Sequence, residues 1–383
     1  MRKGQALLAT ILAVVLVVLA LPNPLAAQGS LDGSASIGVR APIADSPDLD
    51  TGCPPLFLLK PEEPAACSEF RLDPEKRLAL APETEEAEPE SKPTSWFSDL
   101  MTIHPPLIKD DKLRVLLASG IIVGSGLGGF LNAYQETPRH SYHVTYEGWF
   151  GQTTYAGGAD KAAHFVDYAI ITKEMANIYD LMGFSRKTSI ALGFGTAFTS
   201  GLMNEVGDGT NPYGFSPEDL TMDTLGAGTA ALIKLTRTED LFGFRHGLLL
   251  PLQGSKTCCQ SEGLGRDYSN EIYTADLRLA GVFDRLNLKV GPLRYLLFSV
   301  TYSVRGYPTG TPSLRERQVG FEIGIDFPVI LNDLGVNRST WWGYGLHIVF
   351  DNFRFPFTAV GFRYDLNHGK WTGPDNGNEF AAR

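Results

Sequence analysis

The chain has few of the residues that mark the commoner kinds of metal or redox site. Its 383 residues include only four cysteines, at positions 53, 67, 258 and 259. No cysteine pair has the spacing with histidines that a zinc site requires. An oxidising compartment would allow a disulfide between Cys53 and Cys67, whereas a bond between the adjacent Cys258 and Cys259 would be strained. Structural or free thiols are therefore the better interpretation.

Basic residues and nucleotide-binding motifs are also scarce. Lys and Arg number 33 against 43 Asp and Glu, and no basic cluster suggests a nucleic-acid partner. The glycine-rich run at 124–129 lies inside an apolar helix candidate and lacks the Lys-Ser or Lys-Thr of a phosphate-binding loop. No serine stands in the sequence context of a nucleophile elbow. The sequence thus identifies neither a cofactor nor a covalent nucleophile.

The first 28 residues are typical of an export signal. Arg2 and Lys3 precede a largely apolar run at 6–21, and two prolines and the small residues at 25–27 follow it. An uncleaved membrane anchor is the alternative. No cysteine follows the apolar run, so attachment as a lipoprotein is not expected. We expect a mature chain in the periplasm or at the outer membrane.

Residues 29–105 form an acidic linker that is rich in proline. Positions 28–100 hold fifteen Asp and Glu against six Lys and Arg, which is most of the net charge of −10. Such a composition buries too little apolar surface to offset the entropy of ordering the chain, so we expect disorder. The acidity is therefore a property of this linker.

Residues 106–245 predict a bundle of four helices. Apolar residues at helical spacing place the helices at about 115–135, 158–179, 186–206 and 217–235. Ser216 is placed to cap the last helix, with Pro217 at its first position. Glycines 120, 124 and 128 recur every four residues in the first helix, which predicts a face that a neighbouring helix approaches closely. Short connections between amphipathic helices favour a bundle.

Residues 246–370 change to a period of two, which predicts an antiparallel β region. The alternation covers about 273–279, 296–304, 319–327, 342–350 and 358–364. About six strands fall short of the roughly eight with which membrane barrels begin. Two alternatives stay open: a membrane-associated sheet or small barrel-like region completed by other elements, or a soluble sheet that covers the bundle. The fold class is α+β, and residues 371–383 are expected to be a flexible tail.

Ionisable residues stand in otherwise apolar or small-residue segments of the helical region. Asp160 and His164 are four residues apart, so they share one helix face, as do Asp219 and Asp223. Burying an unpaired charge is costly, so such groups need partners. We therefore predict one buried polar cluster, made of Asp160, Lys161, His164, Glu205, Asp208, Asp219 and Asp223.

Three interpretations of this cluster remain open. It forms a structural network of ion pairs, or it binds a metal, or it is an acid–base or hydrolytic centre with His164 as proton acceptor. For a metal, the candidate ligands are His164, Glu205 and Asp223. No two histidines share a helix face, and Lys161 beside a cation would be unfavourable.

The same residues resemble the YfiM-like family of periplasmic lipoproteins, a domain of unknown function. The resemblance covers about residues 110–235 and rests on the run 149–165, on Glu205-x-x-Asp208-Gly209, and on 213–220 followed by Asp223 and Gly226. The order of an Asp-Lys-x-x-His helix, a Glu and paired aspartates before a glycine is also similar to VanZ-like helical membrane proteins. These resemblances imply four helices with inward-facing polar residues, and neither implies a reaction.

The chain departs from the lipoprotein pattern by its missing lipid-anchor cysteine, its acidic linker and its added β region. We expect an exported cell-envelope protein that is a membrane-associated binding or structural factor. Its expected partners are a membrane or envelope lipid and, second, a protein. The alternative is a metal-dependent hydrolase or another enzyme that acts on an envelope lipid or glycan.

Overall fold

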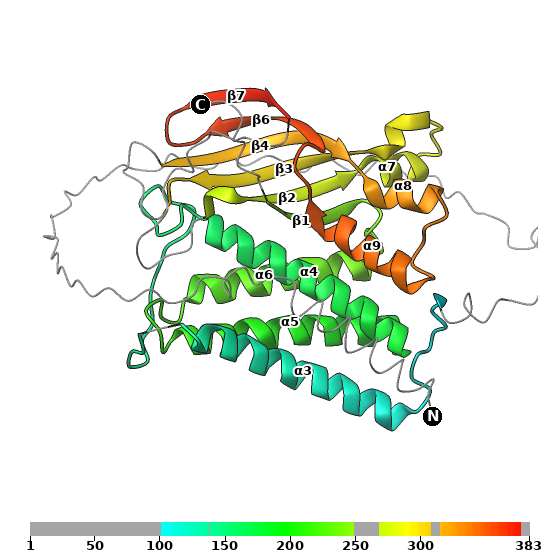
Figure 1. Cartoon of the computed structure of the whole chain (residues 1–383), viewed down its shortest axis with the longest axis horizontal. Coiled ribbons are helices and arrows are strands. Elements are labelled where there is room, and N and C mark those ends of the chain that lie inside the picture. The colour runs from blue at the N-terminus through cyan, green and yellow to red at the C-terminus, as the bar shows by residue number, and fades with distance from the viewer. Residues whose placement is uncertain (1–100, 137, 249–267, 308–314, 377–383) are drawn as a thin grey trace, which may run out of the picture. The chain divides into compact units, whose positions relative to one another are not determined.

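The structure, a computed structural model, describes residues 101–136, 138–248, 268–307 and 315–376. The expected export signal, nearly all of the expected linker and all four cysteines lie outside these residues. The described residues have an α+β fold in which a helical region precedes a seven-stranded sheet (Figure 1).

The four predicted long helices are present. Each ends between one residue before and three residues after its predicted C-terminal end. They are α3 (Asp111–Tyr134), α4 (Ala159–Met182), α5 (Arg186–Asp208) and α6 (Pro217–Thr236). The expected cap of α6 is confirmed, because the Ser216 hydroxyl accepts a hydrogen bond from the Asp219 amide at 3.2 Å. Asp110 and Ser185 cap α3 and α5 in the same way.

The prediction that Gly120, Gly124 and Gly128 of α3 form a face in close contact with a neighbouring helix is wrong. A Cβ built at Gly120, Gly124 or Gly128 would meet nothing within 4 Å, so this line of glycines faces away from the bundle. The close approach is made by Gly129 instead, where a Cβ would lie 2.3 Å from the carbonyl oxygen of Ser200 on α5. Two lines of small residues run along α3, and helix packing uses the line that holds the buried residues of this helix.

The sheet contains four of the five predicted strands and three more, at 242–248, 353–354 and 370–375, that the sequence did not indicate. Its strands are β1 (Phe242–Leu248), β2 (Glu271–Arg278), β3 (Leu296–Arg305), β4 (Glu316–Ile325), β5 (Phe353–Arg354), β6 (Ala359–Asp365) and β7 (Lys370–Asp375). They lie in the order β5-β1-β2-β3-β4-β6-β7, all antiparallel except the pair β1 and β5. The edge strands β5 and β7 do not pair, so the sheet is not closed into a barrel. β7 lies in the segment where a tail was expected.

One predicted strand, at 342–350, is wrong. This segment lies in helix α9 (Trp341–Asn352), whose first turn is capped by Thr340. Its buried residues Tyr344, His347 and Ile348 follow helical spacing. Apolar residues cover both sides of α9, so their alternation at period two did not distinguish a helix from a strand. Two shorter helices, α7 (Leu279–Arg285) and α8 (Phe327–Asp333), follow β2 and β4.

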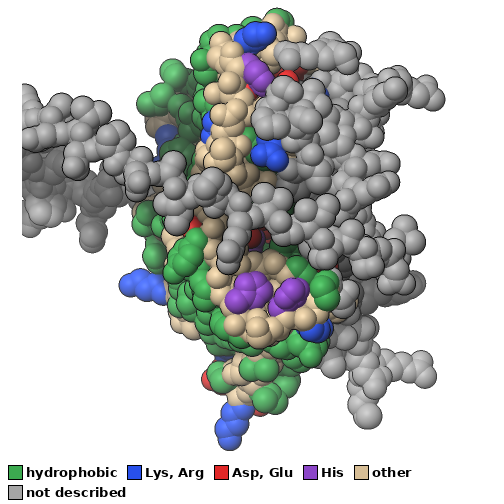
Figure 2. Space-filling view, turned by 90° about the vertical axis from the view of Figure 1, so that its left-hand side faces the viewer, with side chains coloured by type: hydrophobic (Ala, Val, Ile, Leu, Met, Phe, Trp, Pro, Cys, Tyr) green, Lys and Arg blue, Asp and Glu red, His purple; other side chains and the backbone are tan. Residues whose placement is uncertain are grey.

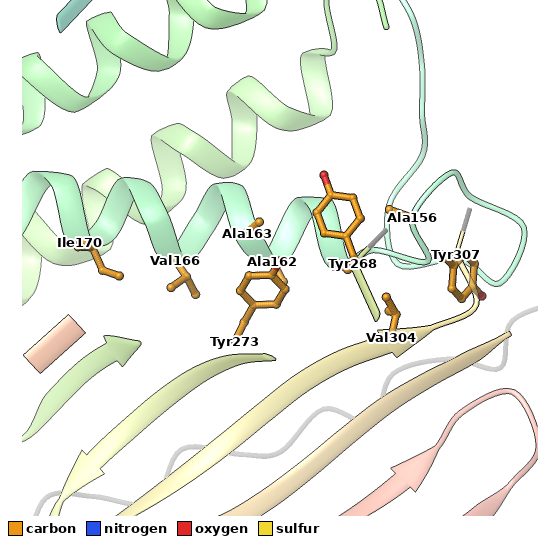
Figure 3. Packing of buried hydrophobic residues seen from close by; sticks show 10 residues of the cluster. Ala156, Ala162, Ala163, Val166, Ile170, Tyr268, Tyr273, Val304 and Tyr307 are labelled. Carbon is orange, nitrogen blue, oxygen red and sulfur yellow. The ribbon is translucent and has the colours of Figure 1, made fainter. Parts of the chain in front are cut away.

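Helix α4 packs against one part of the sheet and so joins it to the bundle. Tyr273 of β2 and Val304 of β3 point toward the alanines and Val166 of α4 (Figure 3). Phe165 of α4 meets Phe244 of β1 edge to face, with ring centroids 5.2 Å apart. This contact fixes α4, which carries the Asp-Lys-x-x-His segment, between the sheet and the other helices.

The opposite face of the sheet buries charged side chains. Arg245 of β1 binds Asp276 of β2, with its Nε 2.6 Å from the carboxylate. Arg354 of β5 donates two hydrogen bonds of 2.8 Å to Glu322 of β4. Three strands separate β5 from β4, and in a flat sheet they would lie about 19 Å apart. The sheet therefore curls around its polar face.

The apolar side chains of β3, β4, β6 and β7 are largely exposed. Ile323 is 53% exposed and Val360 57%. The same is true of outward-facing leucines and valines on α3 and α6. We call this set the outer apolar surface: Val115, Leu116, Val123, Leu127, Leu131, Leu225, Leu232, Leu235, Phe298, Val300, Val319, Phe321, Ile323, Ile325, Val360, Phe362 and Trp371. Hydrophobic side chains also run along the left rim of the described surface in Figure 2.

Candidate functional site

A pair of glycines sets the start of α4. Gly157 and Gly158 have φ values of +62° and +93°, which residues with a Cβ rarely adopt. A Cβ at Gly157 would also lie 2.7 Å from the Tyr307 ring, and one at Gly158 would lie 2.5 Å from Phe150. The chain thus turns tightly between two aromatic rings and enters α4 with its first polar residues directed into the bundle.

Lys161 is buried among three carboxylates. Its ammonium lies 2.5 Å from Glu147, 2.9 Å from Asp160 and 2.5 Å from Asp219. Burial would lower the pKa of Lys161, but the three carboxylates outweigh burial and raise the pKa above its usual value. Lys161 is therefore a permanent cation of the cluster.

His164 bridges two groups of carboxylates. Its Nδ1 lies 2.7 Å from Oδ1 of Asp223, and its Nε2 lies 3.7 Å from Asp160 and 3.9 Å from Asp219. Tyr168, one turn later, stacks on the imidazole with 6.1 Å between ring centroids. Burial would lower the pKa of His164, but Asp219 and Asp223 raise it well above its usual value.

Asp223 occupies the deepest position of the cluster. It is fully buried, and its Oδ2 has no hydrogen-bond partner. Gly201 of α5 makes room for it, because a Cβ there would lie 2.3 Å from Oδ2. Burial raises the pKa of Asp223 to about 6, against the lowering effect of His164. Burial and the nearby Asp160 likewise raise the pKa of Asp219 to about 6.

Glu205 and Asp208 come from the end of α5. Glu205 accepts a hydrogen bond of 3.0 Å from the amide of Ser216, which ties α5 to the start of α6. Asp208 accepts hydrogen bonds from the side-chain amide of Asn204 at 2.9 Å and from that of Asn211 at 2.6 Å. Burial raises the pKa of Asp208 to about 7 and the pKa of Glu205 well above its usual value.

A cavity of about 450 Å³ opens onto this cluster. Five of the seven predicted residues line it, namely Asp160, His164, Glu205, Asp208 and Asp219, whereas Lys161 and Asp223 lie behind them. The structure thus brings all seven together in one place. With Glu147 added, six carboxyl groups face one lysine and one histidine, so acidic groups clearly outnumber basic ones.

The sequence did not single out several members of this region. Glu147 lies in the loop before α4, and the Tyr268 hydroxyl donates a hydrogen bond to Asp160 from the start of the sheet region. His246 of β1 lines the same cavity and binds Asp167 at 2.9 Å and Glu271 at 3.3 Å. These residues are distant in the sequence, and no motif links them to the cluster.

A second polar network lies beyond it, between α4, α6, β1 and α9. Lys234 of α6 binds Asn177 at 2.7 Å and Glu239 at 2.8 Å. Asp351 of α9 binds Arg278, and Arg338 lies 2.5 Å from the same carboxylate. The only feature of the sequence that pointed to this second network was the presence of charged residues within otherwise apolar helices. This network ties α9 and the sheet to the bundle.

Residues 146–235 match a family model. The family is described as a predicted periplasmic lipoprotein family (DUF2279). The match spans the loop before α4 and the helices α4 to α6, and it includes all seven predicted cluster residues and Glu147. No curated protein and no solved structure matches the chain. The family match supports an exported protein of the periplasm or cell envelope, and it assigns no activity.

Proposed function

We propose that this protein is an envelope factor that contacts membrane lipid through its outer apolar surface and keeps its charged groups inside. The observation that carries the proposal is the inverted sheet. Alternating strands of a soluble sheet bury the apolar face and expose the polar one. Here Arg354 and Glu322 are buried while Phe321 and Ile323 are exposed. Strands that face lipid on the outside and polar groups on the inside have this pattern.

The helices support the same interpretation. Helix α3 has no charged side chain between Val115 and Gln135, and α6 buries Asp219, Asp223 and Lys234 while its leucines face outward. Among the described residues, α3 is the one helix that is long and apolar enough to cross a membrane by length and composition. The outer apolar surface covers α3, α6 and the sheet, so a second copy of the chain on one face would leave much of it exposed. Lipid would cover all of it.

Vesicle flotation tests this proposal. Purified protein is mixed with vesicles of phosphatidylethanolamine and phosphatidylglycerol and centrifuged through a density gradient. We expect the wild-type protein to float with the vesicles. Ile323→Arg should reduce the floating fraction, because an Arg on a lipid-facing strand costs about 2–4 kcal/mol at mid-depth. The matched control is Leu334→Arg, since Leu334 is 73% exposed but follows α8 outside the outer apolar surface.

The result that contradicts the proposal is a wild-type protein that stays monomeric in detergent-free buffer and remains at the bottom of the gradient. A soluble dimer of defined size would instead assign the surface to self-association. Equal flotation of both arginine variants and the wild type would exclude the sheet as the lipid-contacting part.

The second candidate function is a hydrolase that acts on an envelope lipid or glycan. It is favoured by the pair of His164 and Asp223, in which the carboxylate orients the imidazole and Nε2 faces the cavity. An incubation of the protein with extracted envelope lipids and peptidoglycan tests it by mass spectrometry of the products. Turnover by the wild type that is lost in a stable His164→Gln variant would support this candidate, and absence of any product would remove it.

A further inference from the structure

We propose that the cavity binds one divalent transition-metal ion between Nε2 of His164 and the carboxylates of Asp160 and Asp219. The inference goes beyond membrane contact and does not depend on it. One imidazole and two carboxylates form a ligand set that suits Zn²⁺ and Mn²⁺. All three residues lie in the segment 146–235, and Asp160 and His164 share one face of α4.

The spacing of the three ligand atoms fits an ion. Nε2 of His164 lies 3.7 Å from Oδ1 of Asp160 and 3.9 Å from Oδ1 of Asp219. The three residues can place their ligand atoms within 4.8 Å of one another. Zinc binds histidine nitrogen and carboxylate oxygen at about 2.0–2.2 Å, so two ligands of one ion lie at most about 4.3 Å apart. An ion can therefore reach all three atoms once the Lys161 ammonium, which lies 2.5 Å from Oδ1 of Asp219, moves away from that oxygen.

The groups behind these ligands are those that a metal site requires. Nδ1 of His164 is 2.7 Å from Asp223, which directs Nε2 at the cavity and increases its basicity. The Tyr268 hydroxyl donates a hydrogen bond to Oδ1 of Asp160, the oxygen that would bind the ion, and so fixes the position of this carboxylate. Metal-bound histidines nearly always donate their second ring N–H to such a partner. Asp223 also keeps Oδ2 buried without a hydrogen bond, which is costly unless the cluster gains positive charge.

The charge balance points the same way. Lys161 is the permanent cation beside the proposed ligands, and it also contacts Glu147 on its far side. The six carboxyl groups of the cluster outnumber Lys161 and His164, so the site can accept the charge of a divalent ion.

Two other groups of metal-binding side chains are less suited. His164, Glu205 and Asp223, the ligands expected from the sequence, also come within 4.8 Å. A 2.7 Å hydrogen bond joins His164 to Asp223, however, and leaves no room for an ion between those atoms. The third group is Glu316, Asp365 and His368 on the sheet, where His368 is exposed. That third group supplies the control.

Metal titration of the purified full-length chain tests the proposal. The protein is treated with a chelator, exchanged into metal-free buffer, and titrated with Zn²⁺ and with Mn²⁺ by calorimetry. We expect one equivalent to bind per chain. His164→Gln should weaken binding at least 100-fold and Asp223→Asn about 10- to 100-fold, the range for groups that orient a ligand. His368→Gln, the matched control, should bind like the wild type.

Lys161→Met provides a second test if His164→Gln does not fold. Removing this cation should tighten metal binding, whereas a purely structural network predicts a destabilised protein that Zn²⁺ does not rescue. The proposal is overturned if the wild type binds neither ion at 1 mM, if a folded His164→Gln variant keeps full affinity, or if His368→Gln alone abolishes binding. Vesicle flotation of the same samples keeps this result separate from membrane contact.

Discussion

The contact between α4 and α6 provides a sharp test of how the site is positioned. Gly226 lies at the closest approach of the two helices, and a Cβ there would be 2.0 Å from the carbonyl oxygen of Phe165 and 3.0 Å from its Cα. Gly228, two residues later on α6, has nothing within 4 Å of the same position. The pair separates the effect of helix packing from the effect of glycine on helix propensity.

The expected free energies follow from these distances. Ala is favoured over Gly within a helix by about 1 kcal/mol, so Gly228→Ala should stabilise the protein by up to that amount. Gly226→Ala gains the same term, but its Cβ meets backbone that cannot rotate away. Overpacking of this kind costs about 1–3 kcal/mol and occasionally more. We expect the two variants to differ by about 3 kcal/mol, with Gly226→Ala below the wild type.

Thermal unfolding measures this difference. For a folded region of about 250 residues, 1 kcal/mol shifts Tm by about 2–4 °C, so the two variants should differ by roughly 6–12 °C. Asp223 lies one turn before Gly226 on α6, so displacement of the helix should also draw Asp223 away from His164 and weaken Zn²⁺ binding. Equal Tm values for the two variants would refute the close packing of α4 on α6.

Three further predictions concern buried groups. Gly201→Ala should displace Asp223, because the new Cβ would lie 2.3 Å from its Oδ2, and should weaken Zn²⁺ binding in calorimetry more than it lowers Tm. Arg354→Met should destabilise the protein by about 3 kcal/mol in denaturant unfolding, because Glu322 loses both of its hydrogen bonds to Arg354 and, among the described residues, keeps only Arg363, at 3.7 Å, as a cationic partner; the double variant with Glu322→Met should recover part of the loss. Burial lowers the pKa of His246, but its carboxylate partners outweigh burial and raise the pKa to about 10. The stability that its charge contributes is therefore complete below about pH 6.5 and lost toward pH 10, so the Tm gap between wild type and His246→Gln should shrink over that interval.

Much of the helical region could be predicted because its signals are local. The Ser216 cap, the proline after it and the apolar spacing of α6 depend on residues within a few turns of one another. The strands around 296–304 and 358–364 were recognisable for the same reason. Helix α9 was not, since a helix with apolar residues on both sides shows the alternation of a strand as well.

Which face of each element is buried could not be predicted from the pattern alone. Alternation shows that one face of β4 is apolar, but it does not say whether protein or another environment covers that face. The buried face of β4 was the polar one, because Glu322 pairs with Arg354 from a strand that begins 28 residues after β4 ends. In α3 the same ambiguity concerned two lines of small residues, and only contact with α5 distinguishes them.

The seven charged residues could be recognised as a group because apolar surroundings make unpaired charge costly, a rule that holds wherever the helices cross. Their arrangement depends on features that carry no charge. Gly201 admits the carboxylate of Asp223, and Gly226 brings the helix that carries it against α4. If either glycine were replaced, His164 would still be on α4 and Asp223 on α6, but the two side chains would be too far apart for their 2.7 Å contact. The chemistry of the cluster therefore depends as much on the two glycines as on the ionisable residues.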